Sequence, residues 1–393
     1  MSQTQAEHGQ FRSEVAAWLA DNLTGEFAKL RGLGGPGREH EAFAERLAWE
    51  RHMAAAGWTC LGWPEEFGGA NLGLAEQVIF HEEYVAADAP ARVNHLGEQL
   101  LGPTLIAMGT AAQQRRFLPK IAAVEELWSQ GYSEPGAGSD LAAVSTAARR
   151  HGDEWVINGQ KIWTSLAHEA DWCFVLARTE PGSSRHSGLS YLLVPLRQDG
   201  VSIRPITQLT GTSEFNEVFF DDARTGADMV VGEVGGGWKV AMATLGFERG
   251  VSTLGQQIGF ARELDGVIEQ AKRTGSYDDP VLRADLTRAW IGLRALRAHA
   301  LRTLSGDGVS GAEAAVGKLM WAQWHRHLGE LAMRARAARS LVTASSQEAP
   351  YELDEWQRLF LFSRADTIYG GSDEIERNII AERVLGLPKE PRP

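Results

Sequence analysis

A glutamate on a small, apolar helix face is the residue of this chain best suited to move a proton. Helical spacing places Glu248 on one face of its segment. The residues that share this face are Ala241, Leu245, Val251, Ser252 and Gly255. An apolar neighbourhood raises the pKa of a carboxyl group towards neutrality, which suits a general base. From spacing alone the plainer alternative is favoured, namely a half-buried structural glutamate or a solvent-facing pair with Arg249.

A run rich in glycine and serine at residues 130–140 is a second candidate for ligand contact. Its sequence is QGYSEPGAGSD, and it lies where helical patterning gives way to strand patterning. Gly136 and Gly138 allow a ligand to approach the backbone closely, and Ser133 and Ser139 supply hydroxyl groups. Ligand sites are common at domain junctions. From spacing alone a turn-rich linker explains the run equally well.

Two further patterns indicate no site. Residues 32–37 match G-x-G-x-x-G, but a helical pattern precedes them where a dinucleotide site requires a strand, so we expect an inter-helix loop. His325 and His327 are two residues apart, and such neighbours on a helix do not face each other. They are therefore expected to be surface or packing histidines, and no metal site is predicted.

The elements that must position these residues follow the order helix, strand, helix. The N-terminal third has helical spacing at residues 11–23, 41–57, 74–87 and 110–124. Short apolar runs separated by turns, as in a small β-barrel or sandwich, follow at 172–177, 189–196, 201–206 and 215–220. Helical spacing returns at 238–271, 280–304, 312–346 and 353–367. Asn158-Gly159, between two apolar runs, predicts the turn of a β-hairpin.

Composition and charge exclude several classes of protein. The chain has 393 residues, which is long for one hydrophobic core, so two or three packed units are expected. The formal net charge of −12 argues against binding nucleic acid or an anionic membrane. Cys60 and Cys173 are too few for a disulfide framework. A polar N-terminus and the lack of an apolar stretch of about 20 residues predict a cytoplasmic protein without membrane insertion.

Four runs of sequence resemble the signatures of the acyl-CoA dehydrogenases, in the order and spacing of that family. They are LGWPEEFGGANLGLAEQVIFHEE at 61–83, YSEPGAGSDLAA at 132–143, INGQKIWTS at 157–165 and YGGSDEIERNIIAERVLGLP at 369–388. The resemblance covers most of the chain and implies an α+β fold that is mostly α. It implies an N-terminal helical domain (1–125), a middle β-barrel (126–232) and a C-terminal four-helix bundle (233–393), with FAD between the barrel and the bundle.

The resemblance also implies which residues bind the cofactor. They are Tyr132, Ser133, Gly138, Ser139, Trp163, Ser165, Ser372 and Glu374. Tyr132 and Ser133 would meet the pyrimidine edge of the flavin. Trp163 would pack against the isoalloxazine ring, and Ser165 would lie near its N5 and O4 atoms. Gly138 and Ser139 would also line the path of the CoA pantetheine. At position 132 the family more often has a smaller aliphatic residue.

With the resemblance, Glu248 becomes the expected catalytic base. In many relatives the base follows the tyrosine of the C-terminal motif, where this chain has Gly370; in others it precedes an arginine on the first long bundle helix, as Glu248 precedes Arg249. Glu248 would remove the α-proton of an acyl-CoA thioester while FAD accepts the β-hydride. The Gly370 N–H would hydrogen-bond the thioester carbonyl, a contact worth about 3–4 kcal/mol. Ser139, Arg249 and Tyr369 are the further substrate contacts implied.

Two elements that homotetrameric relatives use across a subunit interface are missing. Residues 271–277 lack a Phe-Gly after the arginine, and residues 341–347 lack a Gly-Gly at the glutamine. In those relatives both elements reach the FAD of the neighbouring subunit. Their absence predicts a second acyl-CoA dehydrogenase-like subunit in an α2β2 heterotetramer. A diverged homo-oligomer with substitute contacts is the alternative.

The function predicted is the α,β-dehydrogenation of an acyl-CoA thioester to the 2-enoyl-CoA. A bulky or sterol-derived acyl chain is the preferred substrate, and an electron-transfer flavoprotein or similar protein is the expected acceptor. A flavin oxidase or monooxygenase of the same fold is one alternative, because a fold alone does not establish a reaction. A non-catalytic partner subunit is another, against which the ring-facing residues argue.

Overall fold

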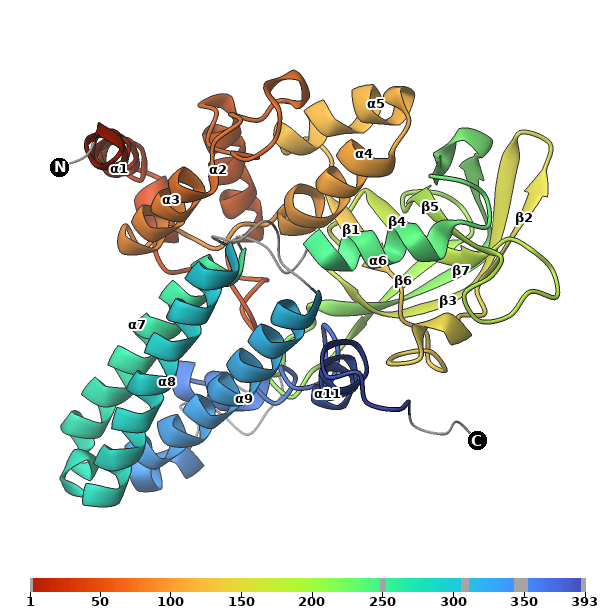
Figure 1. Cartoon of the computed structure of the whole chain (residues 1–393). Helices are drawn as coiled ribbons and strands as arrows, with labels where there is room; N and C mark the ends of the chain where they lie inside the picture. Colours follow the sequence, from red (N-terminus) through yellow and green to blue (C-terminus); the bar gives the residue numbers. More distant parts are fainter. Residues whose placement is uncertain (1–2, 248–251, 305–310, 343–352, 390–393) are drawn as a thin grey trace. The chain divides into compact units, whose positions relative to one another are not determined.

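The computed structural model of this chain describes residues 3–247, 252–304, 311–342 and 353–389 (Figure 1). Their packing forms two compact units. The first comprises residues 3–77, 87–208 and 213–247. The second comprises residues 78–86, 209–212 and the described part of the chain from 252 onwards. In the part of the chain that the structure covers, no helix combines the length and apolar character needed to cross a bilayer.

Helices form the N-terminal part of the first unit, as the sequence predicts. They are α1 (Gln3–Asn22), α2 (Phe43–Ala55), the first turn of α3 (Leu74–Ala86), a π-helical segment (Gly97–Leu101) that continues as α4 (Gly102–Met108), and α5 (Ala111–Ala122). The Thr110 hydroxyl accepts the Gln113 N–H at 3.2 Å, and the Gln113 side chain accepts the Thr110 N–H at 3.0 Å. This reciprocal pair fixes where α5 begins. Sequence patterns did not predict the helices at 97–108.

An eight-stranded mixed sheet forms the middle of the first unit. Its strands are β1 (Trp128–Gly131), β2 (Ala147–His151), β3 (Glu154–Ser165), β4 (Trp172–Arg178), β5 (Leu189–Pro195), β6 (Val201–Ile206), β7 (Phe215–Gly226) and β8 (Val230–Val231). They are ordered β6-β7-β3-β2-β4-β5-β8, and β1 pairs in parallel with β4. Along β4, Phe174 and Leu176 belong to one buried cluster, and Cys173 and Val175 to another. Because successive side chains point to opposite faces, both faces of the sheet are buried here.

The hairpin predicted at Asn158-Gly159 is wrong. Both residues lie inside β3, which pairs with β2 on one side and with β7 on the other. The pairing with β7 shifts between Ile157 and Gly159, where Asn158 alone faces both Asp221 and Asp222, so β7 bulges opposite the dipeptide. Asn158 accepts the Asp222 N–H at 3.0 Å, and a Cβ at Gly159 would lie 2.5 Å from Thr146 Oγ1. Asn158 and Gly159 therefore serve the packing between neighbouring strands, and the backbone does not turn at this dipeptide.

Helix α6 (Gly237–Phe247) packs on the sheet of the first unit (Figure 1). A Cβ at Gly237 would lie 2.4 Å from the carbonyl carbon of Ser190 in β5, so only glycine permits this approach. Further along α6, Thr244 Oγ1 lies 2.9 Å from Thr104 Oγ1, and both residues are buried. Helix α6 is therefore anchored along its length.

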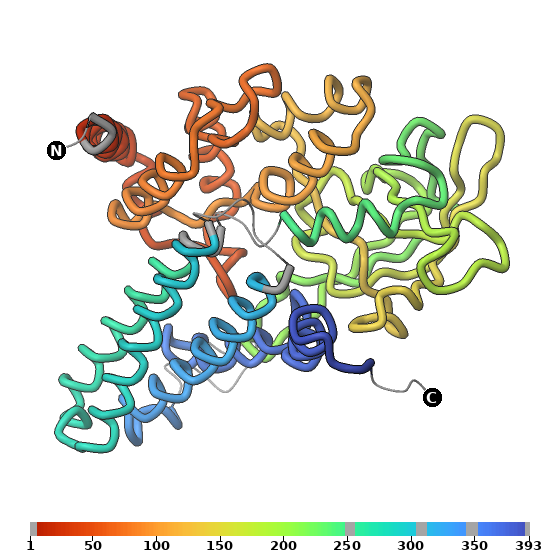
Figure 2. The backbone as a smooth tube through the Cα atoms, in the orientation of Figure 1, coloured from red at the N-terminus to blue at the C-terminus, as the bar shows by residue number. Residues whose placement is uncertain are grey.

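The second unit is a helical bundle with α7 (Ser252–Thr274), α8 (Pro280–Leu304), α9 (Gly311–Arg336), α10 (Glu355–Phe362) and α11 (Asp373–Ile379). Figure 2 shows α7, α8 and α9 side by side, and they share one buried core. Helix α8 has the predicted bounds. The described residues of the helix predicted at 238–271 form α6 and α7, and the α-helix predicted at 312–346 ends at Arg336. Helix α11 was not predicted.

The predicted α+β organisation is confirmed: helices, then a sheet, then helices follow along the chain. The domain boundaries at residues 125/126 and 232/233 stay a prediction.

Candidate active site

The loop after β1 carries the first predicted ligand contacts, Tyr132 and Ser133. The Tyr132 ring is buried and packs edge-on against Phe174 and Tyr191, with centroid separations of 5.9 and 6.2 Å. The Ser133 carbonyl accepts the N–H of Ile162 at 2.9 Å, which ties the loop to β3. The Tyr132 ring therefore serves the core, and its backbone together with Ser133 is what this loop offers a ligand.

A buried lysine beneath this loop is a residue that sequence reasoning missed. Lys161 of β3 is fully buried. Its ammonium donates to the Tyr132 carbonyl at 3.0 Å, to the Leu176 carbonyl at 2.7 Å and to the Glu134 carboxylate at 2.8 Å. Three oxygen acceptors match the three N–H donors of an ammonium group. Lys161 therefore fixes the backbone of the loop that carries Tyr132 and Ser133.

Glu134, the partner of Lys161, is held as a carboxylate. Its side chain accepts the Ser145 N–H at 2.7 Å and the Thr146 N–H at 2.9 Å. Burial alone would raise its pKa, but the Lys161 ammonium and these hydrogen bonds together lower the pKa of Glu134 to about 2. The sequence held a signal for this pair. Lys161 is in phase with the inward-facing Trp155 and Ile157 along β3, and a lysine on such a face requires a buried acid.

Trp163 lies exposed near the end of β3. It falls in the second register shift between β3 and β7, and its φ of 60° is in the left-handed region. Such a backbone costs about 1–3 kcal/mol in a residue with a Cβ and is typical of functional sites. The bulge leaves 55% of Trp163 exposed, with Phe215 edge-on at 6.2 Å. Ser165, also predicted to contact the ligand, pairs with Phe215 and is partly buried. The strand thus presents a flat aromatic face.

Gly138 and Ser139 lie on an exposed turn. Glu134 and Ala137 exchange two backbone hydrogen bonds of 3.0 Å, which close the turn. A Cβ built at Gly136 or at Gly138 would meet no atom within 4 Å. The packing of the protein itself therefore does not require glycine there, and the turn leaves open surface for an extended ligand.

In the second unit, the C-terminal motif forms a loop and the start of α11. Gly370 and Gly371 have φ values of 63° and 95°, and the Ser372 hydroxyl caps α11 by accepting the Ile375 N–H at 3.4 Å. Gly370 is exposed, and the described residues provide no acceptor for its N–H. Hydrogen bonds to its own backbone N–H and to Ser372 lower the pKa of the exposed Glu374. The loop therefore offers a free backbone donor.

Glu248 and Arg249 lie outside the residues that the structure describes. Helix α6 ends at Phe247 and α7 begins at Ser252. Residues 343–347, which belong to the region that lacks the Gly-Gly element of homotetrameric relatives, also lie outside the described ranges. The roles of these residues stay predictions.

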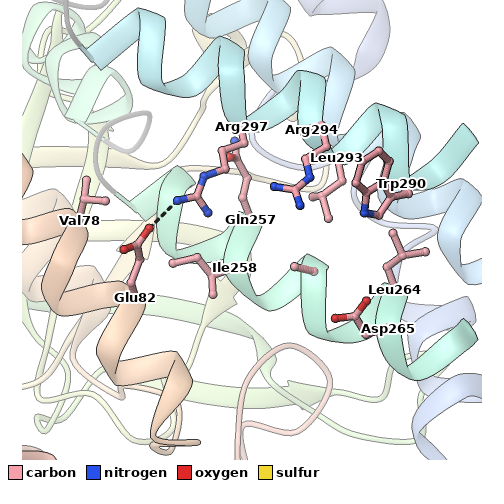
Figure 3. Close-up of a pocket in the computed structure, with 11 residues that line it drawn as sticks. Val78, Glu82, Gln257, Ile258, Leu264, Asp265, Trp290, Leu293, Arg294 and Arg297 are labelled. Carbon is pink, nitrogen blue, oxygen red and sulfur yellow. Dashed lines mark hydrogen bonds and ion pairs between the residues drawn. The ribbon is translucent and has the colours of Figure 1, made fainter. Parts of the chain in front are cut away.

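A pocket in the second unit involves none of the predicted site residues (Figure 3). Its walls come from α3, α7 and α8, and its lining includes Gln257, Ile258, Leu264, Trp290, Leu293 and Arg294. An ion pair of 2.6 Å between Arg297 and Glu82 closes one side. The predicted cofactor and substrate contacts are thus not among the residues that line this hollow.

The groups around Trp163 fit a flavin. A flavin needs an aromatic face against its ring system, and hydrogen-bond partners for the nitrogen and oxygen atoms at its edges. Trp163 supplies the face, and Ser133 and Ser165 supply hydroxyl groups. An exposed aromatic face and two hydroxyl groups thus occur on β3 and on the loop tied to it.

Family comparison defines the class of this protein. The three domains of the acyl-CoA dehydrogenase family match in order: the N-terminal domain at residues 5–125, the middle domain at 129–223 and the C-terminal domain at 235–385. The chain therefore belongs to the acyl-CoA dehydrogenase family, and it is an oxidoreductase of that family.

Individual relatives and solved structures show which members of the family this chain resembles. The chain is 68% identical to acyl-CoA dehydrogenase IpdE1 of Mycobacterium tuberculosis, over 97% of this chain and 98% of the relative. The solved structure of the Tcur3481-Tcur3483 steroid ACAD matches with a TM-score of 0.83 and 29% identity, over 98% of both chains. The ChsE4-ChsE5 complex from Mycobacterium tuberculosis matches with a TM-score of 0.79 and 30% identity, over 98% of both chains.

Proposed function

We propose that this enzyme removes hydrogen from Cα and Cβ of an acyl-CoA thioester, with FAD as its cofactor. The observation that carries the proposal is the exposed Trp163, which a strained bulge presents beside the loop of Tyr132 and Ser133. Membership of the acyl-CoA dehydrogenase family supports the same reaction. When bound, FAD supplies the hydride acceptor that no amino-acid side chain provides.

The residues of this chain have three tasks in the proposed reaction. Glu248 takes the α-proton as the general base. The Gly370 N–H stabilises the negative charge that develops on the thioester oxygen as the proton leaves. Ser139, Arg249 and Tyr369 hold the substrate.

Cofactor binding in the proposal is divided between the two units. In the first unit, Tyr132, Ser133, Trp163 and Ser165 contact the flavin ring, and Gly138 and Ser139 line the adjoining path. In the second unit, Ser372 and Glu374 contact the cofactor. The exposed Trp163 and the hydroxyl groups of Ser133 and Ser165 support this arrangement, because they offer a ring face and hydrogen-bond partners.

We further propose that the acyl chain is bulky or sterol-derived and that the working assembly is an α2β2 heterotetramer. Two of the similar solved structures support this, since one is a steroid ACAD of two named components and the other is a complex of ChsE4 with ChsE5. The end of α7 supports it too. Residues 271–277 contain the last turn of α7 and lead into the short helix Ser276–Asp278, without the Phe-Gly that homotetrameric relatives use. Electrons would pass to an electron-transfer flavoprotein or a similar protein.

The proposal is tested by anaerobic titration of the flavin-loaded enzyme with straight-chain, branched and steroid CoA thioesters. We expect at least one thioester to bleach the flavin and to yield a product that has lost two hydrogens by mass spectrometry, with the steroid thioesters fastest. A flavin-loaded enzyme that none of the thioesters bleaches would overturn the proposed reaction. Peroxide release that outpaces reduction of an artificial one-electron acceptor would establish the oxidase alternative.

A further inference from the structure

A chain of polar side chains crosses the core of the second unit and ends at the loop that carries Gly370. His325 Nε2 lies 2.8 Å from a Glu263 carboxylate oxygen, and His325 Nδ1 lies 2.5 Å from Asp366 Oδ2. The Tyr369 hydroxyl donates to the other Asp366 oxygen at 2.6 Å. These distances are those of charge-assisted hydrogen bonds. The chain therefore links α7 and α9 to the residue directly before Gly370.

The middle of this hydrogen-bonded network is buried and contains charged groups. The side chains of Asp366 and His325 are 1% and 8% exposed, while Glu263 reaches solvent. The Lys318 ammonium donates to the Asp366 carbonyl and lies 5.4 Å from the centroid of the Tyr369 ring. The His325 ring thus lies between the carboxylates of Asp366 and Glu263, and Lys318 holds the Asp366 backbone. A purely structural core at this place would be as stable with apolar residues.

The geometry of the loop shows how this network of side chains can set the direction of the Gly370 N–H. The N–H groups of Ile368 and Tyr369 donate to the Ala365 carbonyl at 2.8 and 3.0 Å, and Asp373 N–H donates to the Thr367 carbonyl at 3.0 Å. These bonds close the loop at both ends. The Gly370 N–H belongs to the peptide plane that Tyr369 and Gly370 share. Its direction therefore follows from the position of Tyr369.

We propose that Asp366, held by His325 and Lys318, positions Tyr369 and thereby aims the Gly370 N–H at the thioester carbonyl. Asp366 and His325 are positioning residues that touch neither substrate nor cofactor. The inference rests on the proposed function, in which Gly370 is the carbonyl donor. It adds to that function the device that keeps the donor in place.

Two substitutions test the link, with one control. Tyr369→Phe keeps the ring and removes the hydroxyl that Asp366 accepts, and Asp366→Asn keeps the shape and removes the charge. His327→Gln is the control, because His327 lies on the same helix with 49% of its side chain exposed and pairs only at the surface with Glu330. Should Asp366→Asn fail to fold, Tyr369→Phe still decides the matter.

The first measurement is the infrared carbonyl stretch of an enoyl-CoA labelled with carbon-13 at its thioester, bound to the flavin-loaded enzyme. Hydrogen bonding to the carbonyl lowers this frequency, and a merely structural role of Tyr369 would not alter it. We expect Tyr369→Phe and Asp366→Asn to lose most of the wild-type shift. Asp366→Asn, which alters no substrate contact, should also lower kcat about tenfold, with KM changed much less, because a transition-state contact is weakened. His327→Gln should match the wild type.

The second measurement is amide hydrogen exchange of peptides that span residues 366–373, which requires no substrate. We expect faster exchange in both variants and unchanged exchange in His327→Gln, because the loop loses its anchor. An active wild type whose carbonyl shift and loop exchange survive Tyr369→Phe would overturn the positioning role alone. A wild type that no thioester bleaches would instead overturn the proposed function, and the exchange data would still show whether Asp366 orders the loop.

Discussion

Each unit has a buried cation that supports a loop with predicted ligand contacts. Lys161 fixes the loop of Tyr132 and Ser133, and His325 leads through Asp366 to the loop of Gly370. Each cation pairs with carboxylates, and each lies beside residues that the family motifs imply in binding. Because buried ion pairs stabilise a fold little better than apolar packing, placement of the site loops explains them better than stability does.

Replacement of Lys161 tests its role in the first unit. Lys161→Met leaves the Glu134 carboxylate buried without its cation, so we expect a loss of about 3–5 kcal/mol in the free energy of unfolding. Flavin content should fall as well, because the Tyr132 carbonyl loses its donor. Denaturant unfolding and flavin absorbance measure the two effects. The double variant Lys161→Met, Glu134→Leu should recover part of the stability, and a single variant as stable as the wild type would refute the assignment.

His325 gives the second unit a pH-dependent stability. Burial opposes its charge, but Glu263 and Asp366 together raise its pKa from 6.5 to about 10. A pKa raised by folding contributes stability that is complete below the unfolded value and is lost as pH rises through the folded value. The stability advantage of the wild type over His325→Gln should therefore be largest at pH 6 and shrink steadily towards pH 10. Urea unfolding at several pH values measures it, with His327→Gln as control; an advantage that grows with pH would contradict the network.

At the residue scale the family motifs predict which residues contact a flavin, and these roles stay predictions. Motif matching points to Trp163 and Gly370 because both lie in runs that resemble family signatures, but it does not predict the residues that support them. It could not find the partners of Lys161 and His325, since Glu134 and Asp366 meet them only through tertiary packing. Spacing on α9 held part of the signal: Lys318, Ala322 and His325 share one buried face, and buried charges on such a face require partners.

At the element scale, long periodic segments were predictable and short or irregular ones were not. Helix α8 matches its predicted bounds because its apolar period runs unbroken between Pro280 and Leu304. Strand β1, strand β2 and helix α11 were missed, since each is too short to show a period. Asn158-Gly159 has the composition of a turn, yet β2 and β7 pair with β3 on both sides and keep it extended. At this position the pairing between strands therefore outweighs the turn propensity of Asn-Gly.

The approach of α6 to the sheet gives a test at this scale. Gly237→Ala places a Cβ against the Ser190 backbone, which cannot move aside as a flexible side chain can. We expect a loss of about 1–3 kcal/mol in the free energy of unfolding, together with slower flavin bleaching, because α6 leads to Glu248. Gly246→Ala is the matched control, since a Cβ there meets nothing within 4 Å and alanine favours a helix. Equal stability of the two variants would contradict the close packing of α6.

At the scale of the whole molecule, motif order predicted the succession of helices, sheet and helices, and the family comparison agrees with it. The assembly is a proposal that the chain's own cofactor content can test. Expressed alone, the chain should purify with well under one FAD per chain. Co-expression with an acyl-CoA dehydrogenase-like partner should give one FAD for each pair of chains in an α2β2 particle. Absorbance and light scattering measure both quantities, and full occupancy with activity in the lone chain would favour the homo-oligomer instead.

The most direct test of the account is single-turnover flavin bleaching by Glu248→Gln. The substitution keeps the size of the side chain and removes the base. We predict that the variant retains its flavin and binds the thioester, while the bleaching rate falls about 10³-fold or more, because proton removal then has no acceptor. Bleaching at the wild-type rate would show that another group takes the proton and would contradict the central claim.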